Sequence, residues 1–262
     1  MTNLAPPLLI HSAESGVLTL TLNRPNARNA LSMGLMGALI DALRSAATDA
    51  SIHVVVIAGA GPAFCAGHDL KELRADPSRA AYQATFARCC ELMTALVRLP
   101  KPVIARVHGV ATAAGCQLVA SCDLAVASTE ARFATPGVNI GLFCSTPMVA
   151  VSRAAGRKAT MEMLLTGEMI DAEKAARIGL INRVAPPERL DAAVAELADA
   201  IASKSPLVLA IGKEAFYRQA ELSLDEAYAY TSEVMTTNML AADAAEGIDA
   251  FLEKRPPNWR GC

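Results

Sequence analysis

The sequence predicts an α/β fold with a helical C-terminal region, and three observations support this prediction. Apolar strand-like runs alternate with helix-like segments through the first half of the chain. Helical periodicity dominates from about residue 148 onward. The chain has 262 residues, of which 53% are hydrophobic, so it can bury a sizeable core. We expect a core over residues 1–200 and a helical oligomerisation region over residues 201–262.

The first half supplies the expected strands and crossovers. Residues 17–22 alternate in polarity, as a strand with one buried face does. Leucines spaced four residues apart predict an amphipathic helix over residues 31–47. Further apolar runs predict strands over residues 53–58, 103–107 and 124–128, and the segments between them predict helices over residues 78–98 and 114–122.

The second half supplies the expected helices, over residues 158–166, 172–178, 189–203, 207–219 and 224–254. The last of these segments carries Tyr228, Tyr230, Met235 and Met239, which we expect to be exposed on a single chain. Because so much apolar surface needs a cover, we expect these helices to pack both on their own core and on other copies of the chain.

Composition and missing motifs exclude several classes of function. The 24 basic and 26 acidic residues nearly balance, which argues against a nucleic-acid or anionic-membrane partner. No apolar run is long enough to span a membrane, and the first residues lack the pattern of a secretory signal. Seven cysteines without a CxxC pair and four scattered histidines predict buried thiols in a reducing compartment and no metal site. The GxGxxG, GxSxG and GxxxxGK[ST] patterns are absent.

Two loops of small residues each follow an apolar strand. One contains Gly67-His68-Asp69, and the other, Ala113-Ala114-Gly115, opens a helix. Backbone N–H groups in such loops and at helix N-termini can converge on a developing oxyanion. We therefore expect a site that polarises a carbonyl group, such as that of a thioester.

The residues around these loops resemble the signatures of the crotonase (enoyl-CoA hydratase/isomerase) superfamily. AFCAGHDL resembles the first signature and KPVIARVHGVATAAGCQLVASCDLAVAS the second. LNRPNARNALS resembles the N-terminal segment, and RFATPGVNIGLFCSTP resembles the third signature. The resemblance runs from about Val17 to FLEKRPP and is greatest to the subgroup of enoyl-CoA hydratase domain-containing protein 3. It implies a spiral of ββα turns whose C-terminal helices build trimers, often paired into hexamers.

The resemblance also implies roles for individual residues. The backbone N–H groups of His68 and Ala114 would form an oxyanion hole, and the motif uses position 68 through its backbone rather than its side chain. Coenzyme A, bound as a thioester rather than as a permanent cofactor, would contact Asn26, Ala27, Arg28, Ala66, His68, Asp69, Leu70 and, within or across subunits, Lys254. Phe133, Pro136, Ile140 and Phe143 would line an acyl pocket or belong to the core.

Two positions depart from the family pattern. Hydratases of this family use two glutamates, and the matching residues here are Gln117 and Gly137. A positioned general acid or base is worth roughly 10²–10⁴ in rate, so we expect ordinary hydratase activity to be weak or absent. Cys144 and Ser145 are the remaining auxiliary candidates, because some relatives carry an acid at the position of Ser145.

Three functions stay open at this point. The chain is an enzyme on acyl-CoA thioesters (a lyase, an isomerase or a thioester hydrolase), an acyl-CoA-binding pseudoenzyme, or a purely structural oligomer. The two retained loops favour the enzyme. The expected location is the bacterial cytoplasm, or the mitochondrial matrix for a eukaryotic chain trimmed of its transit peptide.

Overall fold

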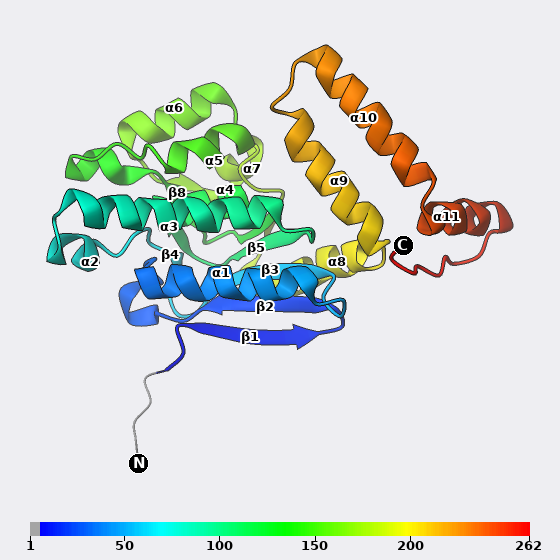
Figure 1. Ribbon diagram of the computed structural model, residues 1–262. Coiled ribbons are helices and arrows are strands. Elements are labelled where there is room, and N and C mark those ends of the chain that lie inside the picture. The colour runs from blue at the N-terminus through cyan, green and yellow to red at the C-terminus, as the bar shows by residue number, and fades with distance from the viewer. Residues whose placement is uncertain (1–5) are drawn as a thin grey trace.

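Two β-sheets organise the computed structural model, which describes residues 6–262 (Figure 1). The larger sheet has the order β1 (Leu9–Glu14), β2 (Val17–Leu22), β3 (Val54–Gly59), β5 (Val103–Val107), β7 (Leu124–Ser128), β10 (Arg183–Ala185). The smaller has the order β4 (Ala63–Cys65), β6 (Val110–Thr112), β8 (Arg132–Ala134), β9 (Ile170–Asp171). Neighbouring strands are parallel except for β1 with β2 and β8 with β9.

The helices complete a repeating unit. They are α1 (Met33–Thr48), α2 (Leu70–Ala75), α3 (Arg79–Arg98), α4 (Ala114–Ser121), α5 (Pro147–Ala154), α6 (Arg157–Thr166), α7 (Ala172–Arg177), α8 (Leu190–Ala202), α9 (Pro206–Gln219), α10 (Leu224–Met239), α11 (Ala242–Glu253). The successive pairs β3–β4, β5–β6 and β7–β8 each give one strand to the large sheet and the next to the small one, and helices follow each pair. This is the predicted ββα spiral, and the α/β class is confirmed.

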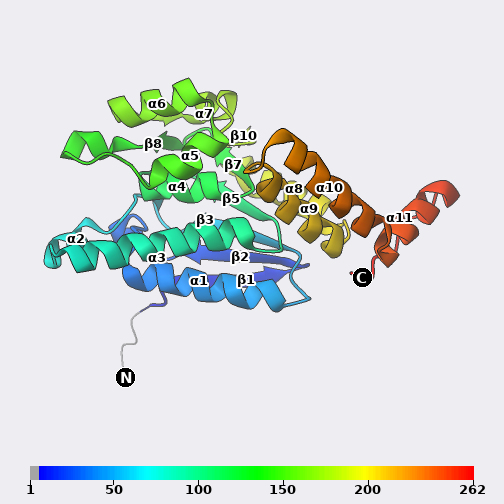
Figure 2. The same cartoon turned by 45° about the horizontal axis from the view of Figure 1, so that its top comes forward.

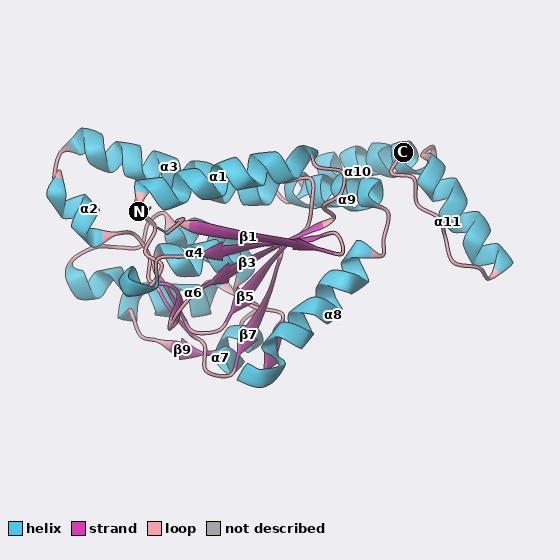
Figure 3. Ribbon diagram, turned by 90° about the horizontal axis from the view of Figure 1, so that it is seen from below, coloured by secondary structure: helices cyan, strands magenta, loops and turns pink. Residues whose placement is uncertain are grey.

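The large sheet is covered on both faces. α1 and α3 lie side by side on one flank, and α8 lies on the other (Figure 3). The main core lies between the sheets and the surrounding helices and includes Leu35, Leu39, Phe64 and Leu92. A smaller core joins α8, through Leu190 and Val194, to β3, β5 and β7. Parallel strands that are buried on both faces explain the continuous apolar runs in the sequence.

The last three helices extend away from this core. α10 lies alongside α9, and α11 lies at the end of the molecule opposite α2 (Figures 1 and 2). Within the described residues, no helix is both long and apolar enough to cross a bilayer.

The predicted helix over residues 224–254 is two helices, which meet at Leu240 and Ala241. The break places Asp243, which is 1% exposed, against the C-terminal tail. Asp243 accepts hydrogen bonds from Ser205 Oγ and from the backbone N–H groups of Arg260 and Gly261. These contacts join residues far apart in the sequence, so helical periodicity could not indicate the break.

Candidate active site

The two predicted loops meet where the small sheet ends. Thr112 Oγ1 donates a hydrogen bond of 3.1 Å to the Ala66 carbonyl and so ties one loop to the other. A Cβ atom added to Gly67 would lie 3.0 Å from Ala113 Cβ and 3.4 Å from Ala114 N. Gly67 also has a φ of +101°, which L-residues with a side chain rarely adopt. Glycine at position 67 therefore brings the His68 segment against the start of α4.

Gly115 brings the same two loops together from the other side. A Cβ atom added there would lie 2.0 Å from the Cys65 carbonyl oxygen, inside any permissible contact. The first turn of α4 therefore packs directly on the backbone of β4, and only glycine allows that approach.

Ala113 turns the chain from β6 into α4 in an unusual conformation. Its φ is +50° and its ψ is −118°, a region that favours glycine and costs other residues about 1–3 kcal/mol. Its N–H donates to the Ala134 carbonyl at 2.9 Å, which anchors the turn to β8. The next residue, Ala114, begins the helix, so its N–H has no acceptor within α4.

The backbone around His68 is fixed by a short bridge to the start of α1. The Leu31 N–H donates to the Gly67 carbonyl at 2.7 Å, and the Asp69 N–H donates to the Leu31 carbonyl at 3.3 Å. No acceptor for the His68 N–H is found among residues 6–262. The N–H groups of His68 and Ala114 are thus both left free beside the junction of the two loops.

Asp69 has a structural role that the sequence did not indicate. It pairs with Arg24 at 2.7 Å and accepts the N–H groups of Lys71 and Glu72 as the N-cap of α2. Although desolvation opposes the shift, Arg24 and these N–H groups hold the pKa of Asp69 below its usual range. Asn29 extends this clamp by donating to the carbonyls of Ala60 and Ala63. Arg24 and Asn29 belong to the LNRPNARNALS segment, and the resemblance of that segment to the family was the one sequence feature that pointed to these two residues.

The residues predicted to contact coenzyme A fall into two groups. The segment from Asn26 to Arg28 adjoins the segment from Ala66 to Leu70, because the Ala66 N–H donates to the Arg28 carbonyl at 3.0 Å. Asn26, Arg28 and Leu70 are exposed at this surface. Lys254 follows α11, at the opposite end of the chain, so a single subunit does not bring it to this group (Figure 1).

Gln117 is buried in α4 and contacts one side chain of α3. The Cys89 thiol donates to Gln117 Oε1 at 3.7 Å. Desolvation raises the pKa of Cys89 to about 12, so the thiol keeps its proton and remains a donor. With Oε1 engaged in this way, the Nε2 hydrogens of Gln117 have no acceptor among the described residues and are available to a ligand.

Gly137 lies where the surrounding chain leaves no room for a side chain. A Cβ atom added there would lie 2.6 Å from the Leu142 carbonyl oxygen and 2.9 Å from Cys144 Sγ. The chain between Leu142 and Cys144 thus occupies the space that a side chain at position 137 would need. Cys144 is 7% exposed, and desolvation raises the pKa of its thiol.

The predicted acyl-pocket residues differ in their exposure to solvent. Phe133 is fully buried in the main core, and Pro136 is half-buried. Ile140 and Phe143 are exposed, at 60% and 44%, as is Ser145. Exposed apolar side chains on this segment are a feature that its sequence alone did not reveal.

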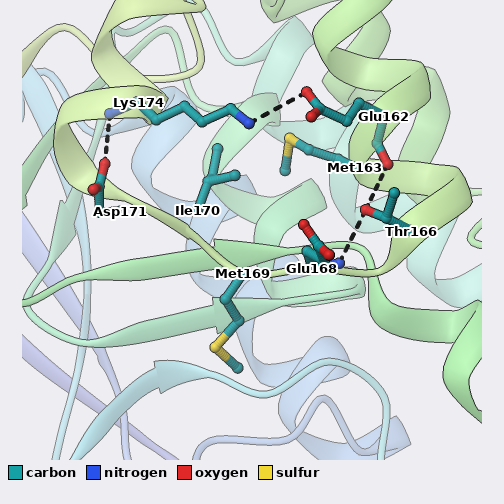
Figure 4. A pocket seen from close by; sticks show the side chains of 8 residues that line it. All are labelled: Glu162, Met163, Thr166, Glu168, Met169, Ile170, Asp171 and Lys174. Atoms are coloured by element: carbon teal, nitrogen blue, oxygen red, sulfur yellow. Dashed lines mark hydrogen bonds and ion pairs between the residues drawn. The ribbon is translucent and has the colours of Figure 1, made fainter.

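A small pocket of about 130 Å³ lies away from these loops, between α6, β9 and α7 (Figure 4). Lys174 pairs with Glu162 at 3.2 Å across it, and the Lys174 N–H donates to Asp171 at 2.7 Å. Its polar groups therefore bind one another, and it contains none of the predicted site residues. The part of the chain described contains no group of three or more His, Cys, Asp or Glu side chains arranged to hold a metal ion.

The chain was compared with known families, sequences and structures. The family described as enoyl-CoA hydratase/isomerase matches residues 12–262. Enoyl-CoA hydratase domain-containing protein 3, mitochondrial, from Xenopus laevis is 48% identical over 253 residues, covering 97% of this chain and 86% of the relative. A crystal structure of human enoyl-CoA hydratase domain-containing protein 3 superposes with a TM-score of 0.94 at 44% identity, covering 97% of this chain and 100% of that one. An enoyl-CoA hydratase from Mycobacterium smegmatis gives a TM-score of 0.95 at 55% identity, covering 97% and 99%. The chain therefore belongs to the enoyl-CoA hydratase/isomerase family, within the crotonase superfamily.

Proposed function

We propose that this protein binds acyl-CoA thioesters and acts on them, holding the thioester oxygen between the N–H groups of His68 and Ala114. The observation that carries the proposal is the close approach of the two loops, with Gly67 against Ala114 N and Thr112 bonded to Ala66. Two preorganised N–H donors stabilise charge that develops on an oxygen, and loss of one such donor typically costs about 3 kcal/mol. The reaction would be of the lyase or isomerase class.

Ordinary hydratase activity should be weak, because the positions of both family glutamates lack a carboxylate. Gln117 can hold water but cannot accept its proton, and the space beside Gly137 is filled by the chain itself. An acyl-CoA-binding pseudoenzyme is the alternative that these same features support.

The test is titration of the purified protein with crotonyl-CoA by calorimetry, together with loss of the enoyl absorbance and direct product analysis. We expect binding, and slow turnover that rises at least tenfold in Gln117→Glu. Gln83→Glu, an exposed position on α3, is the matched control and should change nothing. A Gly137→Glu change is not a useful companion, because its Cβ would collide with Leu142. Turnover by the unaltered chain at ordinary hydratase rates would refute the importance of the missing carboxylates, and absence of binding would refute the proposal.

We also propose that copies of the chain associate through the C-terminal helices as a trimer or a pair of trimers. α10 has no buried residue on a single chain, and Tyr228, Met235 and Met239 are all more than half exposed. A bacterial cytoplasmic location stays a prediction. Several relatives are named as mitochondrial proteins, and that description applies to them.

A further inference from the structure

The two ring nitrogens of His68 are buried, although the residue as a whole is half-buried. Nδ1 and Nε2 are both inaccessible, and neither makes a hydrogen bond of ordinary geometry within the described residues, although the Leu31 carbonyl lies close enough to the ring to raise its pKa. Buried polar atoms in native proteins are nearly always paired, because an unpaired one loses its hydrogen bonds to water without replacement. His108, by contrast, uses Nε2 to contact the Gly61 carbonyl at 2.8 Å. At least one ring nitrogen of His68 therefore has no partner supplied by the described part of the chain.

The position of this ring relates it to Gln117. Its edge meets the ring of Phe86 on α3, with centroids 5.6 Å apart and planes at 77°. Phe86 is 39% exposed, so the imidazole contacts a side chain that reaches the surface. Cys89 follows Phe86 by three residues on the same face of α3 and contacts Gln117. One face of α3 thus contacts both His68, through Phe86, and Gln117, through Cys89.

Three thiols and one carboxylate near the loops are unsuited to moving protons near neutral pH. Desolvation raises the pKa of the Cys65 and Cys116 thiols to about 12, as it does for Cys89. Asp69 is held by Arg24. Desolvation lowers the pKa of His68, the Leu31 carbonyl opposes this shift, and no charged side chain contributes. His68 is therefore neutral at pH 7, with one ring nitrogen able to accept a proton.

We propose that the His68 imidazole is the general base of this site and removes a proton from C2 of the bound acyl group. The inference rests on the proposed thioester site. The C2–H bond breaks, its electron pair passes into the thioester as an enolate, and the proton moves to the imidazole. The N–H groups of His68 and Ala114 hold the enolate oxygen, and the imidazolium returns the proton to carbon. His68 can contact the carbonyl oxygen with its backbone N–H and C2 with its imidazole, because C2 is bonded to the carbonyl carbon. A base on this loop would supply proton transfer that Gln117 and Gly137 cannot.

The test is exchange of the C2 hydrogens of butyryl-CoA in deuterated water, followed by NMR, with binding measured separately by calorimetry. We expect the full chain to exchange them well above the buffer rate. His68→Ala keeps the backbone N–H, so it should still bind butyryl-CoA while exchange falls about 10²–10⁴-fold. His68→Gln, which can hydrogen-bond but not titrate, should lose as much, whereas His11→Ala, at an exposed position on β1, should lose nothing.

The pH dependence tests the same proposal without any variant. The base must be unprotonated, so exchange should be full above the pKa of His68 and fall below it, with an inflection below the usual histidine value of about 6.5. Exchange by His68→Ala at the unaltered rate, or binding of butyryl-CoA by the unaltered chain without exchange, overturns the inference. Failure of the unaltered chain to bind butyryl-CoA overturns the proposed function instead.

Discussion

At the scale of the residue, Gly115 holds the proposed site together by having no side chain. Gly115→Ala would force the first turn of α4 away from the Cys65 carbonyl, since the added atom would lie 2.0 Å from it. Backbone on both sides leaves no flexible group to yield, so we expect a loss of about 3 kcal/mol in the free energy of unfolding, as for severe overpacking. Urea denaturation followed by circular dichroism measures this loss, and acyl-CoA binding should weaken with it.

Gly37 and Gly212 are matched controls for that substitution. Both lie in helices, and a Cβ atom added at either would meet nothing within 4 Å. Alanine is the better helix former there by roughly 0.5–1 kcal/mol, so Gly37→Ala and Gly212→Ala should stabilise the protein. If Gly115→Ala behaved like these two, the close packing of α4 on β4 would be wrong.

The sequence indicates candidate site residues but not the packing around them. The motifs pointed to His68, Ala114, Gln117 and Gly137, and the structure brings His68 and Ala114 to one junction. The sequence could not indicate that the chain fills the space beside Gly137, or that the ring nitrogens of His68 lack an ordinary hydrogen bond. Both features depend on packing between segments that are separate in the sequence.

At the scale of the element, Lys213 attaches α9 to the core. Its Nζ donates to Asp123 Oδ2 at 2.6 Å and to the carbonyls of Leu96 and Lys101 at 2.9 Å, and it is 7% exposed. Asp123 also accepts hydrogen bonds from Tyr217 and from the Val103 N–H. Breaking a buried pair by removing one partner leaves a desolvated charge, so Lys213→Met should cost about 3 kcal/mol.

The exposed ion pair between Arg153 and Glu221 is the control for this loss. Both side chains are at least 60% exposed, so Arg153→Met should change the free energy of unfolding by less than about 1 kcal/mol. Chemical denaturation of the two variants side by side measures the difference. Equal effects would mean that α9 does not depend on the Lys213–Asp123 pair.

Element prediction succeeded where the pattern was local. The strands Val103–Val107 and Leu124–Ser128 have the predicted bounds, because buried parallel strands read as uninterrupted apolar runs. Strands β4, β6 and β8 were not predicted, since three-residue strands have no measurable period. The division of the last helix was missed because its cause is the contact of Asp243 with the C-terminal tail.

At the scale of the whole molecule, the chain combines a covered core with an uncovered extension. The sheets are enclosed by helices, whereas α10 and α11 carry large apolar side chains toward solvent. Leu240, Phe251 and Leu252 are 84%, 82% and 71% exposed. Several large exposed apolar side chains on such an extension are typical of an interface between proteins.

Association through these helices predicts a particle about three times the 27.4 kDa of one chain, or a pair of such trimers. Tyr228, Met235 and Met239 recur at helical spacing and form one stripe on α10. Met235→Glu would bury a charge in that interface and should shift the protein toward the monomer in sedimentation velocity at micromolar concentration. Thr237→Glu, exposed on the opposite side of the same helix, should leave the assembly intact. A monomeric unaltered chain would refute the proposal. Dissociation by both variants would instead show that the stripe has no special role.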